Sequence, residues 1–147
     1  MKKSLLSLTL SSLLATSAMV STQASATGIE GLSANVGVVS QYIFRGVVQT
    51  DTASASAGVD YETDGFYIGA WTADVQDGLE IDVYGGYANE LDSGLGYSLG
   101  FTTYQYTGDF DTSYNEVNLG VSYGVFSLSY NVGEWEVEGG ADQDYDF

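Results

Sequence analysis

The chain has 147 residues, of which 20 are Asp or Glu and only three are Lys or Arg, and it contains no His, Cys or Pro. A chain this acidic repels nucleic-acid phosphates and anionic lipid head groups, so neither is expected as an electrostatic partner. Without His and Cys there is no imidazole base, no thiolate and no disulfide framework, so we expect no enzymatic activity, no metal site and no cofactor.

The first 26 residues have the three parts of a secretory signal peptide. Lys2 and Lys3 form a positive start, residues 4–20 are an apolar run diluted by Ser and Thr, and residues 24–26 read Ala-Ser-Ala, a small-residue cleavage site. A retained helical anchor is the alternative, which the hydroxyl residues and the cleavage motif disfavour. Cleavage after Ala26 would leave a mature domain of residues 27–147 with Arg45 as its sole basic side chain.

The remaining sequence favours β-structure, because it has 19 Gly, 12 Tyr and six Phe, and disordered chains lack aromatic residues while glycine destabilises helices. We expect a first strand at residues 33–45, in which Val39 and Ile43 share a face with Gln41 and Arg45. Tyr42 and Phe44 would then point to the opposite face. Further strands are predicted at residues 54–62, 66–74, 78–87, 95–106, 115–123 and 126–132, with residues 134–138 as a candidate eighth.

Three of these strands alternate clearly between apolar and small or polar residues. Residues 95–104 place Leu95, Leu99 and Phe101 on one face and Gly96, Ser98, Gly100, Thr102 and Tyr104 on the other. The strands around residues 80 and 116 repeat the pattern, so a shift by one residue would move their carboxylates to the apolar face.

The connections alternate between short and long. Residues 63–65, 92–94 and 124–125 are tight turns, whereas residues 46–53, 74–78 and 107–113 are longer polar segments. Such a chain is typical of an all-β, antiparallel up-and-down meander forming a transmembrane β-barrel of the bacterial outer membrane. A soluble β-sandwich would show the same alternation and is the alternative.

The barrel interpretation assigns roles to two sets of residues. The lumen-facing candidates are Gln41, Arg45, Asp60, Glu80, Asp82, Glu116 and Asn118. The candidates for two aromatic girdles at the membrane interfaces are Phe44, Tyr61, Phe66, Trp71, Tyr87, Tyr97, Tyr104, Tyr106, Tyr123, Phe126 and Tyr130.

Four segments carry a resemblance to a known family: "SANVGVVSQYIFRGVVQTD", "AGVDYETDGFYIGAWTADV", "LEIDVYGGYANEL" and "YNEVNLGVSYG". Over residues 33–130 the chain resembles the TorF-type porins of proteobacteria, exported proteins of unknown function. The resemblance implies an outer-membrane β-barrel that acts as a pore, without a known solute or catalytic residue. It also implies outer-membrane lipid, the barrel-assembly machinery and small solutes as partners.

The end of the sequence leaves two alternatives for the barrel. Family members generally continue past this length, and residues 138–147 contain three Asp and two Gly, so we expect the barrel in this chain to be incomplete. The competing interpretation is an eight-stranded barrel whose last strand is residues 137–147, with Tyr145 and Phe147 outward and Asp142, Asp144 and Asp146 inward.

Two kinds of acidic motif resemble functional sites but do not meet their requirements. The pairs Glu80 with Asp82 and Glu134 with Glu136 have the residue types of a glycosidase, but carboxylates alternating on a strand are more often a solvated face. Residues 142–146 begin like a calcium loop and lack its turn glycine.

From the barrel interpretation and the family resemblance, the expected function is passage of small cations or neutral solutes. Arg45 is expected to pair with a carboxylate near the mouth of the barrel. A soluble secreted binding module is the alternative.

Overall fold

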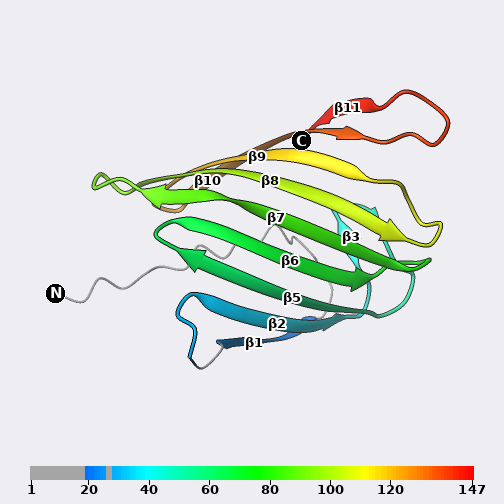
Figure 1. Ribbon diagram of the computed structural model, residues 1–147, viewed down its shortest axis with the longest axis horizontal. Coiled ribbons are helices and arrows are strands. Elements are labelled where there is room, and N and C mark those ends of the chain that lie inside the picture. Colours follow the sequence, from blue (N-terminus) through cyan, green and yellow to red (C-terminus); the bar gives the residue numbers. More distant parts are fainter. Residues whose placement is uncertain (1–18, 26–27) are drawn as a thin grey trace.

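A computed structural model describes residues 19–25 and 28–147 (Figure 1). Every regular element of these residues is a β-strand. The strands are β1 (Met19–Ser25), β2 (Leu32–Val39), β3 (Ile43–Phe44), β4 (Val47–Val48), β5 (Ser54–Thr63), β6 (Phe66–Asp74), β7 (Leu79–Glu90), β8 (Leu95–Thr107), β9 (Tyr114–Tyr123), β10 (Phe126–Trp135) and β11 (Gln143–Asp146).

Nine of the strands form one twisted antiparallel sheet in the order β1-β2-β5-β6-β7-β8-β9-β10-β11. The predicted all-β antiparallel meander is therefore confirmed. The sheet is open: within the described residues, β1 and β11 are its two edges and do not pair with each other, so they do not form a closed barrel. No helix in this part of the chain has the length and apolar character needed to cross a membrane.

β1 lies inside the segment predicted to be a signal peptide. Its seven residues pair with β2 from Met19 opposite Val39 to Ser25 opposite Ser33. The remainder of that prediction, residues 1–18 and Ala26, falls outside the described residues.

The predicted first strand, residues 33–45, is wrong in its second half. β2 ends at Val39, and β3 and β4 form a separate two-stranded hairpin closed by Arg45 and Gly46. Both turn residues have positive φ, 48° and 83°, as in the tight hairpin turn whose twist matches that of its strands. A non-glycine residue in this region is uncommon, so the turn holds Arg45 in a costly backbone conformation.

The predicted alternation of connections is confirmed in part, because residues 91–94 at the short end and residues 75–78 at the long end form links of equal length. At one end of the sheet the links are short: Asp64 and Gly65, residues 91–94, and Gly124 with Val125. Asp64 and Gly65 have φ of 50° and 85°, which again fits a two-residue hairpin turn. At the other end lie residues 40–53, 75–78, 108–113 and 136–142, and the first of these contains the β3–β4 hairpin.

The two faces of the sheet differ in chemistry. One, which we call the apolar face, carries exposed large hydrophobic side chains along every strand from β5 to β10, among them Val59, Ile68, Val83, Leu99, Phe101, Val117, Leu119 and Leu128. The other, the polar face, carries Asp60, Glu80, Asp82 and Glu116 and is covered at one end by the β3–β4 hairpin.

Burial is inverted relative to a water-soluble domain. The largest fully buried side chains are Glu80 and Glu116, whereas Leu128 is 74% exposed. The small core consists of Tyr42, Ala73 and Val75, with Val39, Phe44, Trp71, Tyr106 and Phe110 packed against it. In a β-sandwich the apolar faces of two sheets pack together, but here the second sheet of the described chain, β3–β4, lies on the polar side.

Neither predicted position of a further strand, residues 134–138 or residues 137–147, matches the observed one. Glu134 and Trp135 are the last residues of β10 and do not begin a new strand. The last strand of the chain is Gln143–Asp146. Tyr145 lies on the polar face, where its hydroxyl reaches Glu116, while Asp146 accepts a hydrogen bond from Tyr130 on the apolar face. The inward and outward assignments of this strand were therefore reversed, because Tyr145 lies opposite Gly133, which leaves room for its ring.

Candidate functional site in the polar face

The centre of the polar face is the contact between Arg45 and Glu116. The Arg45 guanidinium donates two hydrogen bonds to Glu116, Nη1 to Oε2 at 2.7 Å and Nη2 to Oε1 at 2.9 Å. The Glu116 side chain is 0% exposed and that of Arg45 is 20% exposed. This two-pronged geometry is the strongest form of ion pair available to a carboxylate, and it fixes the hairpin tip to β9.

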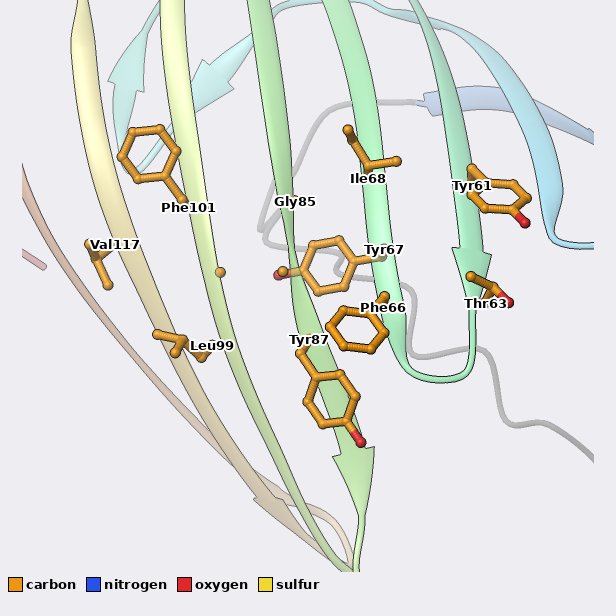
Figure 2. Close-up of a pocket in the computed structure, with 12 residues that line it drawn as sticks. Tyr61, Thr63, Phe66, Tyr67, Ile68, Gly85, Tyr87, Leu99, Phe101 and Val117 are labelled. Atoms are coloured by element: carbon orange, nitrogen blue, oxygen red, sulfur yellow. The ribbon is translucent and has the colours of Figure 1, made fainter.

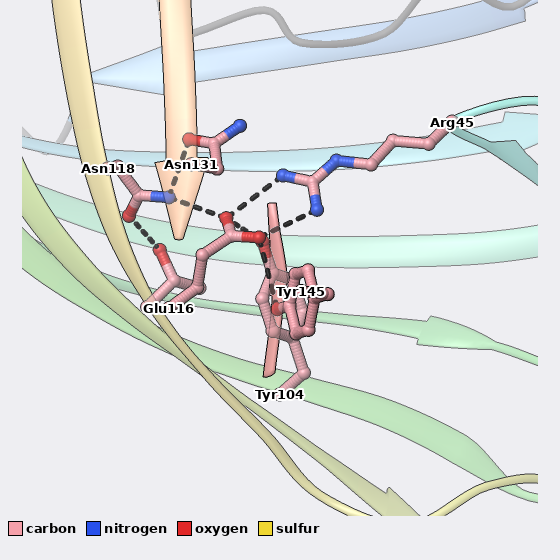
Figure 3. Close-up of polar contacts among 7 residues, drawn as sticks. Arg45, Tyr104, Glu116, Asn118, Asn131 and Tyr145 are labelled. Atoms are coloured by element: carbon pink, nitrogen blue, oxygen red, sulfur yellow. Dashed lines mark hydrogen bonds and ion pairs between the residues drawn. The ribbon is translucent and has the colours of Figure 1, made fainter. Parts of the chain in front are cut away.

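Three further side chains donate to the same carboxylate (Figure 3). The Tyr104 hydroxyl lies 3.3 Å from Oε1, the Asn118 amide 2.6 Å from Oε1 and the Tyr145 hydroxyl 3.1 Å from Oε2. Asn118 also donates to Asn131 at 3.0 Å and accepts from Thr102 at 2.8 Å. Every oxygen of Glu116 is therefore satisfied by donors on β8, β9, β11 and the hairpin.

Aromatic rings enclose the Arg45 guanidinium, whose carbon lies 4.7 Å from the centre of the Phe44 ring and 4.8 Å from that of Phe147. Burial alone would lower the pKa of Arg45, but the hydrogen bonds and the charge of Glu116 raise it. Arg45 therefore remains a cation, and a cation over aromatic faces is further stabilised.

A second acidic pair lies on β7. Glu80 is 1% exposed and Asp82 is 8% exposed, and both point to the polar face. The Tyr42 hydroxyl donates to Glu80 Oε1 at 2.8 Å. Burial and the Glu80 carboxylate raise the pKa of Tyr42, so this hydroxyl stays a proton donor. Among the described residues, Glu80 Oε2 and Asp82 Oδ1 have no hydrogen-bond partner.

Asp60 on β5 is a third acidic residue of the polar face, and its carboxylate accepts hydrogen bonds from side chains on both sides of it. Tyr84 donates to Asp60 Oδ1, and Asn35 donates to Oδ2 at 3.5 Å. The polar face is thus a row of carboxylates across the sheet, in which Arg45 supplies the only side-chain cation of residues 28–147.

The predicted lumen-facing residues fall on this face with one exception. Gln41 lies half-buried in the bend between β2 and β3, outside the alternation of the sheet. Period-two alternation correctly places five candidates on the polar face: Asp60, Glu80, Asp82, Glu116 and Asn118. Arg45 also reaches this face, but from the hairpin turn and not from a strand of the sheet.

The aromatic girdle candidates divide between the two faces. Those on the apolar face are Tyr61, Phe66, Tyr87, Tyr97, Tyr123, Phe126 and Tyr130. Four others lie on the polar face: Phe44 and Tyr104 pack together, Trp71 packs on Tyr42, and Tyr106 packs against the small core. Placing Phe44, Trp71, Tyr104 and Tyr106 in a membrane girdle was wrong.

The contribution of Tyr42 was missed, because a continuous first strand would have turned its ring outward. The break after Val39 reverses that direction, and Tyr42 becomes one of the most buried residues, at 4% exposure. The signal in the sequence was Gly46, which follows Arg45 and permits the hairpin turn.

The apolar face is hollowed beside Gly85 (Figure 2). The hollow is lined by side chains of β5 to β9, which include Tyr61, Phe66, Ile68, Tyr87, Leu99, Phe101 and Val117. Gly85 leaves a gap between Ile68 and Phe101, and the rings of Phe66 and Tyr87 pack 4.9 Å apart at its edge. The lining is almost entirely apolar, so this surface suits a hydrocarbon environment.

The described residues contain no group of three or more His, Cys, Asp or Glu side chains placed to hold a metal ion. A family model described as "Bacterial protein of unknown function (Gcw_chp)" matches residues 23–145. Neither the comparison with curated proteins nor that with solved structures gave a match.

Proposed function

Because the chain belongs to Gcw_chp, a family of bacterial proteins of unknown function, the family supplies no activity, and we propose one from the geometry. The protein is a membrane-embedded β-protein of the Gram-negative outer membrane, whose polar face lines a narrow passage for small cations or neutral solutes. The observation that carries this proposal is the inversion of burial: Glu80 and Glu116 are enclosed while Leu99, Leu119 and Leu128 are exposed.

Water is a poor solvent for the apolar face. Burying apolar surface is favourable by about 25 cal/mol per Å², and a single exposed leucine side chain forfeits roughly 2 kcal/mol relative to burial. Large hydrophobic side chains recur on this face along six successive strands, far beyond the patch size of ordinary monomers. A lipid bilayer removes this cost without a second sheet.

Insertion requires that the backbone groups of the edge strands be paired, since each unpaired group in lipid costs several kcal/mol. The proposal therefore includes closure of the sheet into a barrel in the membrane. The short turns at one end and the longer connections at the other support this arrangement, which is the usual one for outer-membrane barrels.

The passage is narrow because the β3–β4 hairpin lies over the polar face. Tyr42 and Phe44 fill space between the hairpin and the sheet, and Arg45 crosses to Glu116. Without β1, which lies in the predicted signal peptide, the sheet has eight strands, and eight-stranded barrels leave an interior that side chains nearly fill. Selection of small solutes is consistent with this filling, and the excess of carboxylates favours cations over anions. The resemblance to TorF-type porins supports the same function.

Fractionation and gel mobility test the proposal. We expect recovery of the protein only in the detergent-extracted outer-membrane fraction, and a shift in mobility between unheated and heated samples that marks a closed barrel. In planar bilayers, the purified protein should give small, cation-preferring conductance steps. Recovery as a detergent-free soluble monomer would refute the membrane location, and no observation on the described chain favours the alternative of a soluble β-sandwich.

A further inference from the structure

Among the described residues, the buried pair of Glu80 and Asp82 has no positive partner. The two side chains are 99% and 92% buried, and they are neighbours on the same face of β7, where Cα atoms two residues apart are separated by about 6.8 Å. Burying a carboxylate without a partner is strongly unfavourable, and a second carboxylate beside it adds repulsion.

Within residues 19–25 and 28–147, no basic side chain is free to neutralise this pair. Arg45 is the only basic residue after Lys3, and both of its terminal nitrogens are bound to Glu116. Tyr42 satisfies one oxygen of Glu80, but Glu80 Oε2 and Asp82 Oδ1 have no hydrogen-bond partner among the described residues. Two buried acceptors on neighbouring carboxylates therefore remain available to an external cation.

The surroundings favour a small cation. Tyr106 lies opposite Glu80, while Tyr104 and Trp71 lie opposite Asp82 on the two neighbouring strands. These rings exclude water from the carboxylates, and their faces attract positive charge. The strand carbonyls are engaged in the sheet ladders, so the only oxygen ligands are the two carboxylates and the tyrosine hydroxyls.

We propose that Glu80 and Asp82 form a binding site for one monovalent metal cation, Na⁺ or K⁺, in the polar face. A divalent ion is disfavoured because calcium sites gather several carboxylates, and no third acidic side chain joins this pair among the described residues. The site goes beyond the proposed passage and does not depend on it, because a bound cation stabilises the fold whether or not solutes pass.

Thermal unfolding of the full chain in detergent tests the site at constant ionic strength. Chloride salts of Na⁺, K⁺ and N-methylglucamine are compared, since the last cation is too large to enter. We expect Na⁺ or K⁺ to raise Tm by several degrees, and to go on raising it with the logarithm of the cation concentration, because a ligand that binds only the folded state stabilises it by RT ln(1 + [L]/Kd). The double variant Glu80→Gln, Asp82→Asn should lose this dependence.

The matched control is Glu134→Gln with Asp144→Asn, which removes two neighbouring acidic side chains that pair across β10 and β11 and are exposed. This control should keep the cation dependence of the wild type. A second measurement is the ²³Na NMR line width in the presence of the wild-type protein. We expect bound Na⁺ to broaden this line, K⁺ to reverse the broadening and N-methylglucamine to leave it unchanged. This measurement needs only the wild-type protein, so it tests the site even if the double variant fails to fold.

Three results would overturn the assignment. One is an equal Tm in all three salts together with no broadening of the ²³Na line, which would mean that protons or waters neutralise the pair. Another is an unchanged cation dependence in the folded double variant. The third is stabilisation by micromolar Ca²⁺ that requires Glu80 and Asp82, which would make this a divalent site.

Discussion

Arg45 and Glu116 are 71 residues apart in sequence, yet their side chains share two hydrogen bonds of 2.7 and 2.9 Å. The first lies in the left-handed turn of a two-residue hairpin and the second near the start of β9. The contact spans the polar face and binds a connection at one side of the sheet to a strand near the other.

Loss of the Arg45 charge should destabilise the protein. Arg45→Asn keeps a residue that tolerates positive φ and removes the guanidinium, which leaves Glu116 buried without its cation. Removing one partner of a buried ion pair typically costs 3–5 kcal/mol, and since Arg45 is partly exposed we expect about 3 kcal/mol. Urea unfolding in detergent measures this loss.

Adding Glu116→Gln to that variant should recover part of the loss, because no buried charge then remains unpaired. The double-mutant cycle should give a coupling energy of roughly 1–3 kcal/mol. A coupling near zero would show that the ion pair is not a determinant of stability.

Two glycines of the polar face should respond differently to alanine. A Cβ at Gly86 would lie 2.6 Å from the Tyr67 hydroxyl and 2.7 Å from the Gly100 Cα, and closer still to a backbone carbonyl, so the sheet itself must move. A Cβ at Gly120 would meet only the side chain of Ser98, which can rotate away. We expect Gly86→Ala to cost about 1–3 kcal/mol by overpacking and Gly120→Ala less than about 0.5 kcal/mol. Thermal melts in detergent compare them, and equal costs would contradict this account.

A charge on the apolar face tests membrane insertion. Leu119 lies in the middle of β9 and is 44% exposed, and on the proposed function it contacts lipid. Leu119→Arg should reduce stability in lipid vesicles by roughly 2–4 kcal/mol, the cost of an arginine at the bilayer midplane. Val125→Arg is the control, because Val125 lies in the turn after β9 and is 93% exposed. If both variants insert and unfold like the wild type, the apolar face does not contact hydrocarbon.

Ion selectivity tests the passage and the role of Arg45 within it. With carboxylates along the polar face, reversal potentials in a salt gradient should show preference for cations, and this preference should weaken as ionic strength rises. Arg45→Asn removes the one positive charge and should increase the preference, provided that the variant is verified as folded. Anion preference in the wild type would refute the channel, although a structural barrel would remain.

Much of the sheet could be predicted from the alternation of residue types. The strands from residue 54 to 132 were located within a few residues, because their apolar and polar faces are distinct and their turns contain Gly. Tyr104 shares its phase with Gly100 and Thr102, so the alternation itself assigned this ring to the polar face; proximity to a long loop then led to the incorrect girdle assignment. The face to which a side chain points is thus predicted better by its odd or even position in the strand than by its distance from a loop.

The centre of the site was less predictable for a different reason. Pairing of Arg45 with some carboxylate followed from composition, since a single cation faced twenty acidic residues. Which carboxylate it contacts depends on the turn at Arg45 and Gly46, which folds the hairpin over the sheet and brings Tyr42 with it. A contact between residues so far apart in sequence produces no repeating pattern of residue types, so the sequence alone does not predict it.

The nearest-neighbour order of the sheet has a consequence for folding kinetics. From β5 to β10 every strand pairs with the next in sequence, so each step closes a short loop at low entropic cost. The contact of Arg45 with Glu116 must wait until β9 is in place. An interaction that forms after the transition state affects the unfolding rate rather than the folding rate. We therefore expect the loss of Arg45 to speed unfolding and to leave the folding rate nearly unchanged.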